Sequence, residues 1–178
     1  MLNDLARKCL VGNQKAQYEL YQKLAPKMLG VCMRYASDQP QAEDFMQEGF
    51  VRMFTKLNQF NFEGSFEGWV RRIMVNTSLE LLRKEMKRKY HYDIEGEGFD
   101  LAGDDDVLSQ LNAKEMIDVV QSLPPKYRSV FNMYAFEGCK HSEIAKELGI
   151  SEGTSKSNLS DARKWLRKRV SNLFGVKR

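Results

Sequence analysis

The chain has 178 residues, of which 42% are hydrophobic and 29% are charged, and its formal net charge is +4. This composition excludes a chain that is disordered throughout and fits one medium-sized globular domain or two small ones. The sequence has no basic start followed by an apolar run and no stretch of about 18 uncharged apolar residues, so we expect a cytoplasmic protein without membrane insertion.

The spacing of the apolar residues predicts an all-helical fold. They recur at intervals of three and four and never alternate over the length of a strand. Asn3 and Asn13 are expected to cap the first two helices, because an asparagine side chain accepts hydrogen bonds from the amides of a first turn. A third helix is expected to begin at Asp38, with Pro40 in its first turn, and a fourth after Ser65.

One face of the predicted third helix is polar and acidic. Asp44, Gln47 and Glu48 lie at i, i+3 and i+4, while apolar side chains occupy most other positions. In a protein whose other surfaces are basic, an acidic patch is better suited to a protein partner than to DNA. Taken alone, this face is equally consistent with an ordinary solvent-exposed surface.

An aromatic, glycine-containing loop precedes the fourth helix, and basic residues follow on the helix itself. The candidate contact residues of this segment are Phe60, Asn61, Phe62 and Asn76, and Arg71 and Arg72 begin the basic surface of the helix. Aromatic side chains beside cationic ones are typical of surfaces on which unpaired bases stack, so single-stranded DNA is the expected ligand. Phe66 and Trp69 instead share one helical face and are expected to belong to the core.

An acidic segment separates two basic ones. Residues 1–90 carry 15 basic and 10 acidic side chains, residues 91–113 carry no basic and seven acidic ones, and residues 114–178 carry 13 basic and seven acidic ones. The acidic segment has three glycines and no apolar period, and it offers too little apolar surface to fold alone. We therefore predict two small helical domains, 1–90 and 113–178, joined by an acidic flexible linker at 91–112.

The C-terminal domain is predicted to contain a helix-turn-helix. A helix near residues 105–121 is followed by a break at Pro124 and Pro125 and by another helix. Further along, Gly149 suits the left-handed residue that ends a helix, and Ser151 can cap the next one. The break between these last two helices is therefore specified by the sequence.

The second helix of this pair is predicted to bind duplex DNA. Short polar side chains at its start suit base edges in a major groove, and the basic side chains that follow suit phosphates. The candidates are Lys156, Ser157, Asn158, Ser160, Arg163 and Arg167. An ordinary antiparallel helix pair with a solvated basic end is the alternative interpretation.

Three stretches together resemble the extracytoplasmic-function (ECF) group of bacterial RNA polymerase sigma factors, in the sigma-70 family. AEDFMQEGFVRMF is similar to the part of region 2 that binds the polymerase. FEGSFEGWVRRIMVNTSLELLRK is similar to the element that melts and reads the minus-10 strand, and GCKHSEIAKELGISEGTSKSNLSDARKWLRK to region 4, which reads minus-35.

The resemblance implies a protein that binds core RNA polymerase and directs promoter-specific transcription initiation, with no catalysis and no cofactor of its own. Its implied partners are the core enzyme, promoter DNA that is single-stranded at minus-10 and duplex at minus-35, and an anti-sigma factor. Polymerase binding would fall to Asp44, Gln47 and Glu48. Minus-10 recognition would fall to Asn61, Phe62, Arg71, Arg72 and Asn76, and minus-35 recognition to Lys156, Ser157, Asn158, Ser160, Arg163 and Arg167.

Three positions depart from the family pattern. Lys140 stands where the family usually has a hydroxyl cap, Ser155 where an apolar residue commonly packs, and Asn158 where arginine is frequent. The first two departures are expected to cost helix stability. The third leaves the minus-35 sequence open.

Two other classes of protein are alternatives to a sigma factor. A stand-alone helix-turn-helix regulator would have a similar reading helix, but it leaves the acidic face and the aromatic loop without a role. An enzyme is not expected, because the chain has two histidines and three widely spaced cysteines, which form no metal or catalytic pattern.

Overall fold

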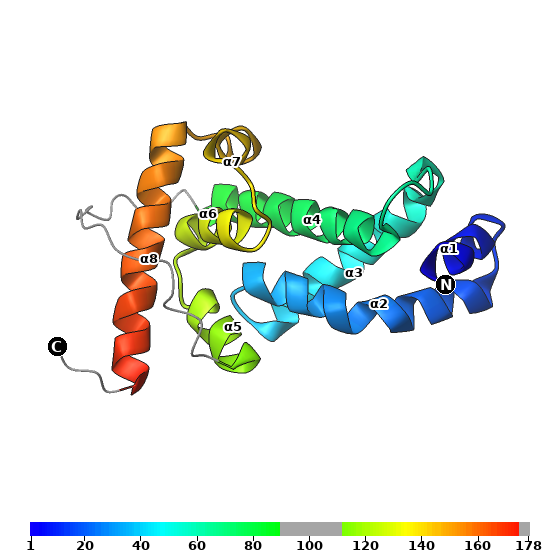
Figure 1. Ribbon diagram of the computed structural model, residues 1–178, viewed down its shortest axis with the longest axis horizontal. Coiled ribbons are helices and arrows are strands. Elements are labelled where there is room, and N and C mark those ends of the chain that lie inside the picture. The colour runs from blue at the N-terminus through cyan, green and yellow to red at the C-terminus, as the bar shows by residue number, and fades with distance from the viewer. Residues whose placement is uncertain (90–111, 175–178) are drawn as a thin grey trace. The chain divides into compact units, whose positions relative to one another are not determined.

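The computed structural model describes residues 1–89 and 112–174 (Figure 1). Within these residues it contains eight α-helices, one short 3-10 helix and no strand, which confirms the predicted all-helical class. The chain divides into two compact units, Met1–Met86 and Lys87–Arg178. The predicted acidic linker lies outside the described residues, apart from Asn112.

The first unit is an arrangement of long helices with a short one at its start (Figure 1). Its elements are α1 (Leu2–Leu10), α2 (Gln14–Tyr35), α3 (Gln39–Thr55), the 3-10 helix η1 (Leu57–Gln59) and α4 (Phe66–Lys89). Helix α2 packs against both α1 and α3, and α1 also contacts η1.

Local capping explains most of the helix starts in this unit. Asn13 accepts a hydrogen bond from an amide of the first turn of α2, Asp38 does the same for α3, and Ser65 for α4. The predicted cap at Asn3 is wrong, because α1 begins at Leu2, two residues before the start that this cap implies, and its first carbonyl acceptor is that of Met1.

The core of the first unit is made of large aliphatic and thioether side chains. The fully buried ones include Leu20, Leu24 and Met28 of α2, Met53 of α3, and Val70, Met74 and Leu79 of α4. Burial of each stabilises the fold by about 1.5–3 kcal/mol relative to exposure. At Gly49, α3 approaches α4 so closely that a Cβ atom would lie 2.2 Å from the Met74 Sδ.

The second unit packs three short helices against one long one (Figure 1). Its elements are α5 (Ala113–Gln121), α6 (Pro125–Ala135), α7 (His141–Leu148) and α8 (Glu152–Phe174). Asn112 caps α5, with its side chain accepting from the amides of Lys114 and Glu115. No helix among the described residues of either unit is long and apolar enough to cross a membrane.

The break between α7 and α8 has the predicted geometry. Gly149 lies in the left-handed region, at φ 68° and ψ 35°, and ends α7. The Ser151 Oγ accepts a hydrogen bond of 3.0 Å from the Thr154 amide and so caps α8. Behind the turn, Ile144 and Leu159 are buried, and the helix-turn-helix is confirmed.

Candidate functional site

The loop between η1 and α4 is folded around three aromatic side chains. The Phe60 ring centroid lies 5.1 Å from that of Phe66 and 5.3 Å from that of Trp69. Phe60 and Phe66 are buried, whereas Trp69 is only half-buried. The core assignment is therefore confirmed in full for Phe66, while part of the Trp69 indole stays accessible.

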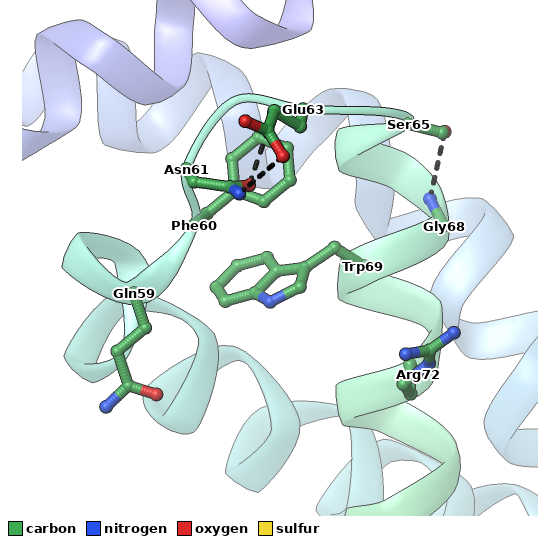
Figure 2. Close-up of a pocket in the computed structure, with 8 residues that line it drawn as sticks. All are labelled: Gln59, Phe60, Asn61, Glu63, Ser65, Gly68, Trp69 and Arg72. Atoms are coloured by element: carbon green, nitrogen blue, oxygen red, sulfur yellow. Dashed lines mark hydrogen bonds between the residues drawn. The ribbon is translucent and has the colours of Figure 1, made fainter.

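A pocket of about 390 Å³ opens beside the accessible part of the indole (Figure 2). Figure 2 shows the indole projecting from α4 toward the loop, with Asn61 and Glu63 on one side of it. The lining residues are Gln59, Phe60, Asn61, Glu63, Ser65, Gly68, Trp69 and Arg72. The wall thus combines an aromatic surface, an amide, a carboxylate and a guanidinium group.

Two hydrogen bonds fix the polar edge of the pocket (Figure 2). The Asn61 Nδ2 donates to the Glu63 Oε2 at 2.9 Å, and the Glu63 amide donates to the Asn61 Oδ1 at 3.3 Å. Both residues are exposed. A ligand in the pocket would therefore meet a carboxylate and an amide that are already oriented by one another.

Phe62 lies between these two residues but is not among those that line the pocket. Its φ is 63°, and it is the one non-glycine residue with a positive φ in the described part of the chain. Its ring packs edge-on against Phe60, with centroids 5.1 Å apart. On α1, the guanidinium carbon of Arg7 lies 4.6 Å from the centroid of the Phe62 ring.

The other predicted minus-10 residues lie on α4. Arg72 is exposed and lines the pocket, and Asn76 is exposed one turn further along the same helical face. Arg71 is half-buried and does not line the pocket. The structure therefore brings Asn61 and Arg72 together, with Asn76 beyond them, and places Phe62 and Arg71 outside the pocket wall.

The predicted acidic face on α3 is partly tied to its neighbour α4. Asp44 and Gln47 are exposed, whereas Glu48 accepts from the Arg52 Nε at 2.8 Å. Arg52 also donates to Glu80 of α4. Its guanidinium, followed by the Lys84 ammonium, lowers the pKa of the Glu80 carboxyl to about 2. Asp44 and Gln47 are therefore the freer part of the face.

The predicted reading residues are spread along α8 from Lys156 to Arg167. Lys156 and Ser157 are exposed, and Asn158, Ser160, Arg163 and Arg167 are half-buried. The Ser157 Oγ donates to the Thr154 carbonyl at 3.0 Å. The guanidinium carbon of Arg163 lies 5.5 Å from the centroid of the Tyr134 ring of α6, so the guanidinium group contacts an aromatic side chain of the neighbouring helix.

Ser155, which departs from the family pattern, is completely buried and hydrogen-bonded. Its Oγ lies 2.9 Å from the Nδ1 of His141, the first residue of α7. The His141 ring is stacked on Tyr134, with centroids 5.1 Å apart. Burial, and then the charges of Lys156 and Arg163, lower the pKa of His141. The buried hydroxyl thus has a partner on the neighbouring helix, which reduces the expected cost of Ser155.

The other departure is compensated in a different way. Lys140 has no side-chain acceptor to offer the first turn of α7. Instead, the Glu143 carboxylate accepts a hydrogen bond of 2.7 Å from the Lys140 amide. This is one half of a capping box, and it also places a negative charge at the helix N-terminus.

Sequence reasoning did not single out Glu63, Arg7 or Tyr134. A carboxylate within an aromatic loop was a visible signal for Glu63. No local pattern marks Arg7 or Tyr134, because each acts on a residue from a separate part of the chain.

The two units match two family models. Residues 20–88 match the model described as Sigma-70 region 2, and residues 113–166 match the model described as Sigma-70, region 4. The RNA polymerase sigma-H factor of Pseudomonas aeruginosa is 26% identical over 174 residues, which cover 92% of this chain and 90% of that protein. The ECF RNA polymerase sigma factor SigW of Bacillus subtilis is 27% identical over 174 residues, covering 91% and 92%.

A solved structure has the same fold. The sigma factor RpoE from Bartonella quintana, in complex with the anti-sigma factor NepR, superposes with a TM-score of 0.51. Its sequence identity is 21%, and the match covers 90% of this chain and 98% of that one.

These matches show that the chain belongs to the sigma-70 family of RNA polymerase sigma factors, in its ECF group. Its function is to bind core RNA polymerase and direct promoter-specific transcription initiation. Sigma factors are initiation factors rather than enzymes. The match to region 2 is not expected of a stand-alone helix-turn-helix regulator.

Proposed function

We propose that three surfaces of the chain have separate roles in transcription initiation. The pocket beside Trp69 takes an unpaired base of the minus-10 strand, α8 reads the minus-35 duplex, and the exposed face of α3 binds core polymerase. Residues 1–90 then act as region 2 and residues 113–178 as region 4, with 91–112 as the connection between them.

The chemistry of the pocket suits an unpaired base. A base stacked on an aromatic side chain gains about 1–3 kcal/mol, and the half-buried Trp69 offers such a face. The Glu63 carboxylate can accept from an exocyclic amine, and the exposed Arg72 can pair with a phosphate beside the base. Asn76, one turn beyond Arg72, extends this surface along α4.

The chemistry of α8 suits a duplex instead. Its exposed first turns carry Lys156 and Ser157, and Asn158 can make the paired hydrogen bonds by which an amide recognises adenine. Arg163 and Arg167 follow at a spacing of four, on one side of the helix, where they can neutralise successive phosphates.

The polymerase surface centres on Asp44 and Gln47. Both are exposed on one face of α3, and Glu48 beside them is held in place by Arg52. An acidic patch of this kind fits a basic surface on a protein partner and selects against the DNA backbone.

Two further assignments follow from the family. The sigma factor of the matched solved structure is in complex with an anti-sigma factor, and we propose that this chain has an inhibitory partner of the same class. We also place the chain in the cytoplasm, where bacterial RNA polymerase works, as a factor without catalytic activity.

The observation that carries this proposal is the contrast between an aromatic pocket in one unit and a polar, basic helix in the other. Transcription in vitro tests it, with bacterial core polymerase, this protein and a randomised promoter library. Transcripts should depend on two separate sequence elements. Asn61→Ala and Arg72→Ala should slow initiation on duplex templates. On templates melted in advance, the initiation rate should recover. No transcription above that of core enzyme alone would overturn the proposal.

A further inference from the structure

The side chain of Arg7, on helix α1, contacts the pocket loop. Arg7 is exposed in the last turn of α1, where a cation is favoured, and its guanidinium lies over the Phe62 ring at 4.6 Å. Helix α1 lies before residues 20–88, the part that matches the region 2 family model. The contact therefore joins a segment outside the matched region to the loop inside it.

The residue that Arg7 contacts is under backbone strain. Phe62 has a φ of 63°, a conformation in which the Cβ of an L-residue is crowded. The free energy of this strain is of the same order as that of a cation–π contact at an exposed site. Two terms of similar size mean that the contact can determine how often the loop adopts this conformation.

The strained residue sits between two residues that line the pocket. The bonds between Asn61 and Glu63 span Phe62, and they need the chain to turn at that position. If Phe62 relaxed to an extended conformation, the Asn61 and Glu63 side chains would stay on one side of the chain, but their Cα atoms would move to about 6.6 Å apart. The bond from the Glu63 amide to the Asn61 Oδ1, which needs the turn, would then be lost. The conformation of Phe62 therefore sets the orientation of both polar groups in the pocket.

We propose that Arg7 is a positioning residue for minus-10 recognition: it holds the Phe62 ring, and through it the Asn61 and Glu63 side chains that face the pocket. Helix α1 is then part of the minus-10 module without touching DNA. This inference rests on the role proposed above for the pocket.

The test compares Arg7→Ala with Lys8→Ala in the holoenzyme. Both residues are exposed cations in the last turn of α1, but the ring contact belongs to Arg7. The rate of open-complex formation is followed by permanganate reactivity of thymines. Loss of a cation–π contact should slow opening about two- to fivefold for Arg7→Ala, while Lys8→Ala should open at the parental rate. Equal rates for the two variants would overturn the inference.

A double variant separates positioning from a direct phosphate contact. If Arg7 acts through the ring, Arg7→Ala should add nothing to a chain that already carries Phe62→Leu. If Arg7 instead binds a phosphate, the two effects should add and the salt dependence should become shallower. Full additivity would therefore overturn the positioning role.

Trp69 provides a readout that does not involve DNA. In a Trp165→Phe chain it is the one tryptophan left, and Arg7→Ala should increase its quenching by acrylamide, whereas Lys8→Ala should not. If Asn61→Ala and Arg72→Ala leave opening intact, the minus-10 assignment fails, and the role of Arg7 in opening fails with it. If those variants slow opening and Arg7→Ala changes neither opening nor quenching, the positioning role alone is wrong.

Discussion

The two proposed DNA-binding surfaces lie at the loop between η1 and α4 and at the turn between α7 and α8. The contacts that hold these two segments span different distances along the sequence. At the turn, Gly149 and Ser151 act within their own helix ends, and the His141–Ser155 bond spans 14 residues. In the loop, Phe62 packs against Phe60 nearby and is also held by Arg7 of α1, near the start of the unit's sequence. The turn is thus a local structure, whereas the loop depends on how the whole unit packs.

This difference also predicts which substitutions should disrupt each surface. A cap such as Ser151 contributes about 1 kcal/mol through one hydrogen bond, and its loss stays local. The loop rests on α4, which packs against α3 at Gly49, so a change far from the pocket can reach it. The first unit should therefore be sensitive to distant core substitutions, and the second to substitutions at the turn itself.

Gly49→Ala should have the largest effect. The added Cβ would lie 2.2 Å from the Met74 Sδ, the far end of a flexible side chain that is fully buried and must repack within the core. Overpacking of this kind typically costs about 1–3 kcal/mol, and the better helix propensity of alanine offsets up to about 1 kcal/mol of that. Hydrogen exchange should show weaker protection across α3 and α4 and unchanged protection in α7 and α8. Gly30→Ala is the matched control, because nothing lies within 4 Å of its Cβ and alanine favours the helix. Loss of protection in both units would contradict the comparison.

The sequence predicted the parts of the fold that local signals specify. Asp38, Ser65 and Ser151 were found as caps, and Gly149 as a left-handed residue, because each needs only its nearest neighbours. The start of α1 was missed, since Leu2 follows Met1 with no side-chain cap to mark it. Where a cap is present, the capping residue and its nearest neighbours determine most of the geometry of that helix end.

The candidate site was less predictable, because its geometry comes from contacts between distant residues. Asn61 and Arg72 were named and do line the pocket, but Phe62 was named and is turned toward Arg7. Ser155 was expected to weaken α8, and its buried bond to His141 could not be read from spacing. Side chains that act across helices need the packed structure to be recognised.

Asp44→Arg should weaken binding to core polymerase about tenfold, or about 1.4 kcal/mol. It replaces an exposed carboxylate by a cation, which a basic surface on the partner would repel. Glu48→Lys is a less clean test, since it also removes the bond to Arg52. Glu80→Gln controls for that network, as it disturbs Arg52 from α4 and leaves the acidic face unchanged. Fluorescence anisotropy with labelled protein measures the affinity. Parental affinity for Asp44→Arg would remove α3 from the interface.

Lys156→Ala should have a smaller effect on duplex binding, of a kind that identifies a phosphate contact. The dependence of log K on log salt should become shallower by about 0.9, with little change in sequence preference. Asn158→Ala should do the reverse, relaxing the preference at one base pair and keeping the salt slope. Binding by the holoenzyme at several salt concentrations separates the two. The same response from both variants would contradict the division of α8 into base and phosphate contacts.

The smallest expected effect concerns pH and the turn in the second unit. Burial, with Lys156 and Arg163 nearby, lowers the pKa of His141, while Glu152 opposes the shift. The unfolded chain then binds the proton more readily, so the free energy of unfolding should fall as pH drops below about 6.5, the ordinary pKa of histidine.

His141→Gln keeps a polar partner for Ser155 without titrating, and hydrogen exchange in α7 and α8 should then vary less with pH. His91→Gln, at the other histidine of the chain, should keep the parental profile. An unchanged profile for His141→Gln would mean that the turn is held independently of this ring, which would make it more local still.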